Sequence, residues 1–254
     1  MAGSRVALIV LLLWLHSWHA PQSSVAEKFD VWIGTTQHEQ TESKGIYHAR
    51  FDAERGRLST PMLAAEIESP GFLTLDPTGK ILYATGRQHK SDSLSAYRIE
   101  RMNQATRLVL LNSQPIGAGG AAHLATDRAG RLLLSAQYGG SSVAVFALQE
   151  DGSLGKRLQL AKHKGGAGVV ADRQEAPHPH WVGTSPDNRF VFVPDLGLDA
   201  VVIYRLDADA IPPLTPAGHA VAPPGAGPRH MKFHPNGKFV YLLKELALPV
   251  TAFF

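Results

Sequence analysis

The residues best suited to chemistry in this sequence are histidines and an arginine that stand next to prolines. The chain contains 12 histidines and no cysteine, which excludes disulfides, thiol catalysis and Cys-zinc sites. One string reads Pro177-His178-Pro179-His180 and another reads Pro228-Arg229-His230. Two imidazoles spaced as His178 and His180 share one face of a strand and can bind a metal. No acidic partner stands nearby in the sequence, so we expect no metal site.

Other known catalytic and cofactor-binding motifs are absent or incomplete in this sequence. The Gly-x-Ser-x-Gly string of a nucleophile elbow is absent. The segment 38–42 lacks the second histidine of a zinc-protease helix, and no helix pattern follows the glycine-rich segment 117–120. We read the glycine-rich segment as a loop, and we expect no cofactor.

The elements that must position these side chains repeat along the chain. Each unit has a short strand, a four-residue turn and a second strand, and a third and a weaker fourth strand follow. The turns begin at Asp76, Asp127, Ser185 and His234, at intervals of 51, 58 and 49 residues. Pro at the second turn position and Gly or Asn at the last suit the backbone angles of such turns. A period of about 50 residues with four strands per unit predicts an all-β propeller, with a loop at 162–176 in the longest interval.

Alignment of the units on their turns gives His180 and Arg229 the same position in successive blades. His123 and His230 stand one residue further along. The first strand of each blade lines the central channel of a propeller, so these polar groups should gather at one mouth of the channel. The alternative is that each histidine is a hydrogen-bonded structural residue and that Arg229 pairs with an acid.

Composition bounds the function. The chain has 254 residues, of which 44% are hydrophobic and 19% charged, as expected for a folded, core-forming protein. Its net charge of +3 is spread over 25 basic and 22 acidic residues. This excess is too small to indicate a nucleic-acid partner. The sequence leaves the oligomeric state open.

The N-terminus has the features of an export signal. Arg5 precedes an apolar run over 6–15, which is too short to span a membrane but has the length of a signal-peptide core. We therefore expect a signal peptide at 1–26, with cleavage after Ala20 or Ala26, and no stable membrane insertion. The protein would be periplasmic or secreted. A buried N-terminal strand or a misassigned start, which would give a cytoplasmic protein, is the alternative.

The remaining residues 27–254 form one expected propeller domain. At the observed period they supply about four and a half blades, and the last unit stops inside its third strand at 250–254. We favour a propeller that is incomplete at its C-terminus. The alternative is a closed ring of four blades that uses the strand Val31-Trp32-Ile33.

Six strings occur in the order typical of one family. They are Ser43-Lys44-Gly45-Ile46-Tyr47, Leu111-Asn112-Ser113-Gln114-Pro115, Tyr138-Gly139-Gly140, Pro177-His178-Pro179-His180, Val193-Pro194-Asp195-Leu196-Gly197 and Gly227-Pro228-Arg229-His230. The sequence is similar to the seven-bladed lactonase propellers, which include 6-phosphogluconolactonases and the fungal carboxy-muconate lactonizing enzymes. The resemblance runs from about residue 30 to the last residue and covers about two thirds of a family member.

The resemblance implies a site in the central cleft made of His180, Arg229 and Glu245. Glu245 would act as general base, Arg229 would hold a phosphate or carboxylate, and His180 would donate to the oxyanion. His178, His123 and His230 are further candidates for substrate binding. Two positions depart from the family pattern, because Lys244 and Gln137 each replace an Asn.

Three functions follow from these observations. The first is hydrolysis of a small-molecule sugar lactone, specifically 6-phosphogluconolactone to 6-phosphogluconate. The second is a non-catalytic propeller that binds a ligand, and the third is a cycloisomerase of the muconate type. Export favours the second function or a different lactone, because phosphorylated sugars belong to the cytosol.

Overall fold

The computed structural model describes residues 28–36, 42–88, 90–102, 105–248 and 250–253. The expected signal peptide at 1–26 lies outside these residues. The described residues form strands and turns without a helix, arranged as four four-stranded antiparallel sheets and one three-stranded sheet. None of them belongs to a helix long and apolar enough to cross a membrane. The all-β prediction is confirmed.

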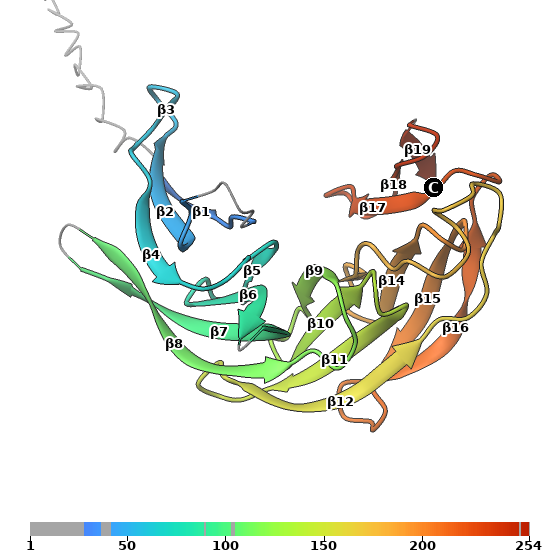
Figure 1. Ribbon diagram of the computed structural model, residues 1–254, viewed down its shortest axis with the longest axis horizontal. Helices are drawn as coiled ribbons and strands as arrows, with labels where there is room; N and C mark the ends of the chain where they lie inside the picture. Colours follow the sequence, from blue (N-terminus) through green and yellow to red (C-terminus); the bar gives the residue numbers. More distant parts are fainter. Residues whose placement is uncertain (1–27, 37–41, 89, 103–104, 249, 254) are drawn as a thin grey trace, which may run out of the picture.

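The five sheets follow one another along an open arc (Figure 1). The first contains β1 (Lys28–Ile33), β2 (Gly45–Asp52), β3 (Arg57–Leu58) and β4 (Met62–Glu66). The second contains β5 (Leu73–Leu75), β6 (Ile81–Gln88), β7 (Ser91–Arg101) and β8 (Thr106–Pro115). The third contains β9 (Ala121–Thr126), β10 (Leu132–Gln137), β11 (Ser142–Leu148) and β12 (Leu154–Lys162). The fourth contains β13 (Gly183–Thr184), β14 (Phe190–Asp195), β15 (Ala200–Leu206) and β16 (Leu214–Val221), and the fifth contains β17 (Pro228–Phe233), β18 (Val240–Lys244) and β19 (Val250–Phe253).

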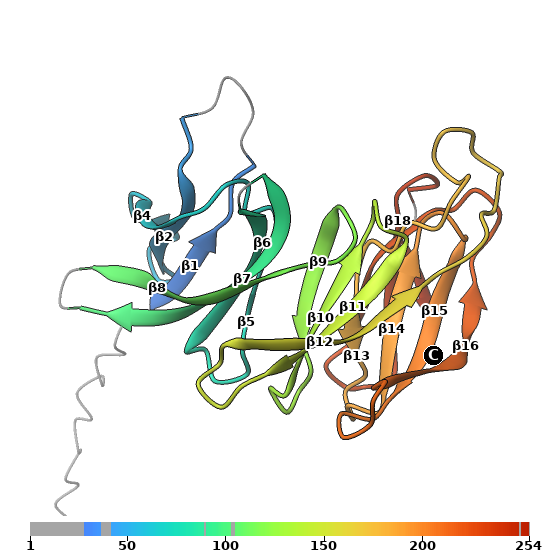
Figure 2. The same ribbon diagram turned by 60° about the horizontal axis from the view of Figure 1, so that its bottom comes forward.

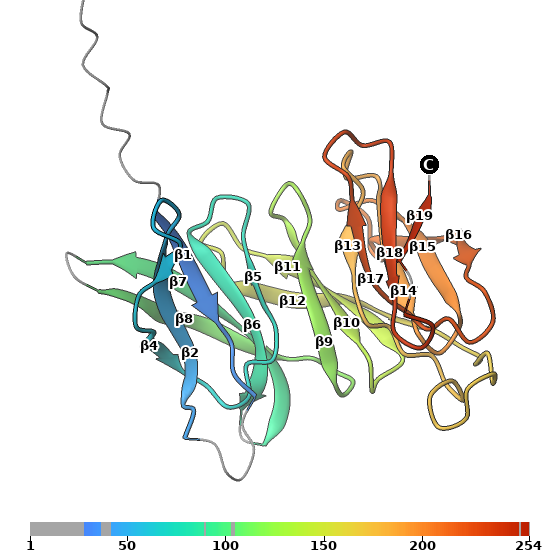
Figure 3. The same ribbon diagram turned by 90° about the horizontal axis from the view of Figure 1, so that it is seen from above.

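The sheets stand side by side like blades, with β5 and β9 toward the inside of the arc and β8 and β12 toward its outside (Figures 1 and 2). Seen from above, the sheets are successive layers along the length of the molecule (Figure 3). This arrangement confirms the propeller prediction. The closed ring of four blades is wrong, because β1, which contains Val31, Trp32 and Ile33, pairs with β2 in the first sheet.

Apolar clusters join each sheet to the next. The cluster between the second and third sheets includes Tyr83, Leu133 and Phe146, which are almost fully buried. The cluster between the fourth and fifth sheets is smaller, with Val201, Met231 and Leu242 buried. Truncation of a side chain such as Phe146 to Ala typically costs about 3–5 kcal/mol. Packing between neighbouring sheets is therefore what holds the arc together.

The predicted turns explain why the second strands begin where they do. Asp76 Oδ1 accepts the backbone N–H groups of Lys80 and Ile81, each at 2.8 Å, and Gly79 takes a φ of 67° that favours glycine. The turn that starts at Asp127 has the same arrangement, because Asp127 Oδ1 accepts the backbone N–H groups of Arg131 and Leu132 at 2.7 and 2.8 Å. These carboxylates replace the hydrogen bonds that the backbone loses at a turn.

One predicted strand is shorter than expected. The first strand of the fourth sheet, expected from Pro179 onward, is reduced to β13 and an isolated bridge between Pro179 and Asp195. The gap in the ladder spans residues 180–182, opposite Pro194 of β14, which has no N–H to donate across it. The expected loop at 162–176 is present, and no strand is assigned between Lys162 and Gly183.

Candidate active site

A change of strand register marks the same position in three successive sheets. Ala122 is the extra residue between the pairs Ala121–Gln137 and His123–Ala136, and Arg229 is the extra residue between Pro228–Lys244 and His230–Leu243. In the fourth sheet the register also changes by one residue within 180–182, between the pairs Pro179–Asp195 and Gly183–Phe192. A β-bulge redirects the side chain of its extra residue. The register change in the fourth sheet thus falls at or next to His180, the position that the sequence alignment gives the same level as Arg229.

Glu245 completes the predicted trio. It directly follows β18, and its backbone N–H donates to the carbonyl of Gly227 at 2.8 Å. Arg229 Nε donates to Glu245 Oε2 at 2.8 Å, and His180 Nε2 lies 3.9 Å from the same oxygen. The structure thus brings the imidazole, the guanidinium and the carboxylate to one place.

A fourth residue, Arg173, joins the trio, and the sequence did not predict it. Its Nη2 donates to Glu245 Oε1, so a different guanidinium holds each carboxylate oxygen. Arg173 belongs to the loop inserted in the longest repeat interval. The position of this insertion could have pointed to Arg173. The insertion directly precedes the His178–His180 string, so its residues had to lie near the same mouth of the channel.

The loop that carries Arg173 is closed at its base by the buried carboxylate of Asp195. His163 Nδ1 lies 2.6 Å from Asp195 Oδ2 at the start of the loop, and the His178 N–H donates to Asp195 Oδ1 at 2.7 Å at its end. Asp195 and the His163 side chain are almost fully excluded from solvent. One carboxylate therefore fixes both ends of the segment 163–178.

A second buried carboxylate, Asp199, links the loop to the strand that holds Arg229. Gln174 Nε2 donates to Asp199 Oδ1 at 2.7 Å, and the Gly227 N–H donates to the same oxygen at 2.8 Å. The Gly225 N–H donates to Asp199 Oδ2 at 2.6 Å. Gln174 is the neighbour of Arg173, and Gly227 lies two residues before Arg229. Asp199 thereby sets the two arginines at a fixed separation.

The charges of the site hold Glu245 in its ionised form. Burial raises the pKa of Glu245, but hydrogen bonding and charge from Arg173, followed by Arg229, outweigh burial and leave the pKa below its ordinary value. Burial lowers the pKa of His180, and the positive charge of Arg229 lowers it further. At neutral pH the site therefore contains one carboxylate, two guanidiniums and a neutral imidazole.

The further histidine candidates surround His180. The His180 and His230 ring centroids are 5.3 Å apart, and those of His230 and His123 are 5.6 Å apart. Burial, followed by neighbouring histidines, lowers the pKa of His123 to about 3 and that of His230 to about 4. His123 is buried and its ring packs against Phe72 and Trp181.

His178 is linked to His180 through the ring of Tyr138. Its ring stacks on Tyr138 at 4.3 Å between centroids, and its Nδ1 lies 3.0 Å from the Tyr138 carbonyl oxygen. The Tyr138 ring meets His180 edge-on at 5.6 Å. Within the described residues, no group of three or more His, Asp or Glu side chains is placed to hold a metal ion.

The two departures from the family pattern have different surroundings. Gln137 is fully buried, where its Nε2 donates to the Ile116 carbonyl at 2.9 Å and its Oε1 accepts from Ser142 at 2.9 Å, so it braces a core turn. Lys244 is buried opposite Pro228 in the β17–β18 ladder. The leading influences on the Glu245 pKa come from burial, Arg173 and Arg229, not from this lysine.

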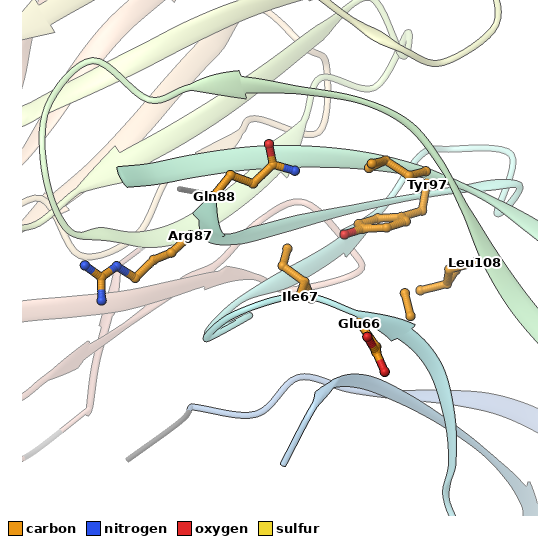
Figure 4. Close-up of a pocket in the computed structure, with 8 residues that line it drawn as sticks. Glu66, Ile67, Arg87, Gln88, Tyr97 and Leu108 are labelled. Carbon is orange, nitrogen blue, oxygen red and sulfur yellow. The ribbon is translucent and has the colours of Figure 1, made fainter. Parts of the chain in front are cut away.

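A separate hollow lies between the first and second sheets (Figure 4). Glu66, Arg87, Gln88 and Tyr97 are among the residues that line it, and the Arg87 and Glu66 side chains point away from each other. The hollow shares no residue with the cluster around Glu245. The concentration of charge at Glu245, rather than this hollow, marks the candidate active site.

An arc of blade-like antiparallel sheets with polar side chains at the starts of inner strands defines a β-propeller with an axial site. The chain belongs to the family described as "Lactonase, 7-bladed beta-propeller", whose model matches residues 30–254. The family predicted from the Pro-His-x-His and Pro-Arg-His strings is confirmed.

Named relatives fit this family. The chain is 35% identical over 225 residues to the 6-phosphogluconolactonase of Bacillus subtilis strain 168, covering 89% of this chain and 62% of the relative. It is 31% identical over 213 residues to the 6-phosphogluconolactonase of Formosa agariphila, covering 82% and 60%. The solved structure of the periplasmic gluconolactonase of Pseudomonas aeruginosa matches with a TM-score of 0.80 at 30% identity, covering 89% and 64%. The chain thus spans less than two thirds of each of these relatives.

Proposed function

We propose that the chain carries the central site of a lactone hydrolase that converts 6-phosphogluconolactone to 6-phosphogluconate. The observation that carries this proposal is the meeting of Arg229, Glu245 and His180 on a lactonase-family scaffold. The names of the relatives support the reaction class. The phosphorylated substrate and the residue roles are the finer part of the proposal.

The proposed reaction is attack of water on the lactone carbonyl carbon. Glu245 accepts a proton from the attacking water, a role that typically contributes about 10²–10⁴-fold. Negative charge develops on the carbonyl oxygen, and His180 donates a hydrogen bond to it from Nε2. The carbon–oxygen bond of the ring then breaks, Glu245 passes the proton taken from water to the leaving ring oxygen, and the product is the open-chain acid.

Substrate binding would also activate the base. Arg229 holds Glu245 in the absence of ligand and helps to lower the pKa of the carboxylate. When the Arg229 guanidinium turns to an anionic group of the substrate, Glu245 loses that stabilisation and becomes a stronger base. His178 and His230 are the candidates for contact with the sugar hydroxyls.

The test is acid release from δ-6-phosphogluconolactone, measured against its spontaneous hydrolysis. We expect a rate above background for the protein and a loss of about 10²–10⁴-fold for Glu245→Gln. Arg189→Gln is the matched control, because Arg189 lies on an outer turn and its side chain is 65% exposed. A folded protein without a rate above background on any lactone would support a ligand-binding propeller instead. Turnover of a muconate would support the cycloisomerase.

We propose, as an alternative setting for this site, that the protein is exported with residues 1–26 as its signal; an exported protein would act on an unphosphorylated lactone, because phosphorylated sugars belong to the cytosol. The apolar run behind Arg5 and the periplasmic relative support this proposal. Cell fractionation and N-terminal sequencing of the mature protein test it. Recovery of an uncleaved chain from the cytosol would contradict export.

A further inference from the structure

We propose that Arg173 is a second anion-binding residue of this site and that it makes the site selective for lactones carrying a phosphate group. The inference rests on the proposed function for its reaction, but its evidence is the position of Arg173. Arg173 and Arg229 come from different segments of the chain and meet at the two oxygens of Glu245. The site therefore contains a pair of guanidiniums rather than one.

The charge balance gives this pair its significance. A single guanidinium beside Glu245 would leave the site neutral, because the carboxylate is ionised. Arg173 adds the charge that makes the group of Glu245, Arg229 and Arg173 cationic at neutral pH, where His180, with its lowered pKa, stays neutral. The buried carboxylates of Asp195 and Asp199 lie behind this group and are already engaged by hydrogen bonds within the protein. A phosphate monoester carries about −1.5 to −2 charges at pH 7. Such a group gains from the second guanidinium, whereas an uncharged sugar does not.

Both guanidiniums are accessible to a ligand. The side chains of Arg173 and Arg229 are 37% and 39% exposed. Arg173 binds Glu245 through Nη2 and also hydrogen-bonds the Tyr138 side chain, and Arg229 binds Glu245 through Nε. Each guanidinium has five N–H donors, so both keep further donors for a ligand. Planar forks of this kind match the oxygens of a phosphate in pairs.

Arg173 is held in place from outside the ion pair. Its neighbour Gln174 is fully buried and donates to Asp199 Oδ1 at 2.7 Å and to the Leu196 carbonyl at 2.9 Å. The Val170 N–H donates to Gln174 Oε1 at 3.1 Å, which closes the turn beneath Arg173. Because these bonds fix the backbone, the Arg173 side chain can leave Glu245 for a ligand without unfolding the loop.

The competing explanation is that Arg173 serves only to fasten the loop to Glu245. The two explanations differ in what removal of the charge does. A fastening residue would affect stability and all ligands alike. A phosphate-binding residue would affect phosphorylated ligands selectively, and its loss would also raise the pKa of Glu245, because Arg173 is the largest influence that lowers it.

The experiment compares the binding of 6-phosphogluconate and gluconate by isothermal titration calorimetry at low ionic strength and pH 7.5. The proteins are the wild type, Arg173→Gln, Arg173→Lys and the outer-turn control Arg189→Gln. We expect the wild type and the control to prefer 6-phosphogluconate. Arg173→Gln should bind 6-phosphogluconate about ten- to hundredfold more weakly and gluconate about as before, the range expected for a lost charge-assisted hydrogen bond. Arg173→Lys should fall between, because it keeps the charge without the fork.

The proposal is overturned if the wild type does not prefer 6-phosphogluconate, or if both ligands weaken equally in Arg173→Gln. Should Arg173→Gln fail to fold, an unchanged preference of Arg173→Lys for 6-phosphogluconate would also overturn it. The outcome is independent of turnover. Selective phosphate binding without lactone hydrolysis would refute the proposed function and leave the role of Arg173 intact.

Discussion

Arg229 and Glu245 face each other across the β17–β18 hairpin, with Nε 2.8 Å from Oε2. Arg229 is the extra residue of a β-bulge, and the Gly227 carbonyl accepts the Glu245 N–H at 2.8 Å. The bulge turns the arginine toward the acid, and the backbone bond keeps the acid at the end of β18. The geometry of the β17–β18 hairpin therefore fixes the distance between the two side chains.

Replacement of Arg229 by Lys should impair substrate binding more than turnover. Lysine keeps the positive charge but lacks the planar fork that binds an oxyanion in pairs. We expect KM for 6-phosphogluconolactone to rise about tenfold or more while kcat changes less. Steady-state kinetics of the variant measure both constants. A fall in kcat with KM unchanged would contradict a substrate-holding role.

Replacement of His180 by Phe should lower kcat with a smaller effect on KM. The ring would keep its packing against Tyr138 and His230, but no donor would face the developing oxyanion. Loss of one such donor costs about 10²–10³-fold in other hydrolases. The exposed His219 on β16 provides the matched control as His219→Phe. Equal activity of the two variants would remove His180 from the mechanism.

Replacement of Asp199 by Asn should loosen the site from a distance. Asp199 takes a φ of 49°, which Asn tolerates, so the change acts on hydrogen bonds rather than on backbone conformation. An amide group in place of one oxygen leaves at least one donor among Gln174, Gly225 and Gly227 without an acceptor, at about 1–3 kcal/mol for each. Urea denaturation should show this loss.

A second measurement on Asp199→Asn separates positioning from stability. Without urea and at a low temperature, the variant stays folded. Its preference for 6-phosphogluconate over gluconate should still decrease, because Arg173 and Arg229 are no longer held at one separation. Full retention of that preference would limit Asp199 to a stabilising role.

Acid should destabilise the protein through His123. Burial, then His230 and His180, lower the pKa of His123 from 6.5 to about 3. As the pH falls below about 6.5, the unfolded chain binds a proton that the folded chain does not. The free energy of unfolding then decreases by up to about 1.4 kcal/mol per pH unit until the pH approaches the folded pKa.

His123→Phe should flatten this pH dependence, because Phe keeps the packing against Phe72 and Trp181 and does not titrate. Urea denaturation of both proteins at several pH values between 6.5 and 4 provides the comparison. Identical slopes would mean that other groups cause the acid sensitivity.

The turns and the repeat were accessible from the sequence because they depend on local chemistry. Asp76 and Gly79 occupy fixed positions in a turn, and the same pattern recurs at Asp127 and Gly130. The shared level of His180 and Arg229 also followed from the repeat, since equal spacing from the turn puts residues at equal heights.

Glu245 and Arg173 were not accessible in the same way. Glu245 has no counterpart in the repeat pattern and was assigned only through the family resemblance. Arg173 lies in an insertion, where no periodicity constrains direction, and its place depends on Asp195 and Asp199, which are distant in the chain until the strands pair. Long-range bonds of buried carboxylates leave no local pattern in a sequence.

The double attachment of the segment 163–178 to Asp195 has a wider implication. Because its two ends are secured to a single buried acid, its exposed residues can be exchanged without disturbing the sheets on either side, provided that Gln174 keeps its bonds to Asp199 and Leu196. Divergence of ligand preference among such proteins could then proceed by replacement of this one segment, with the scaffold inherited unchanged.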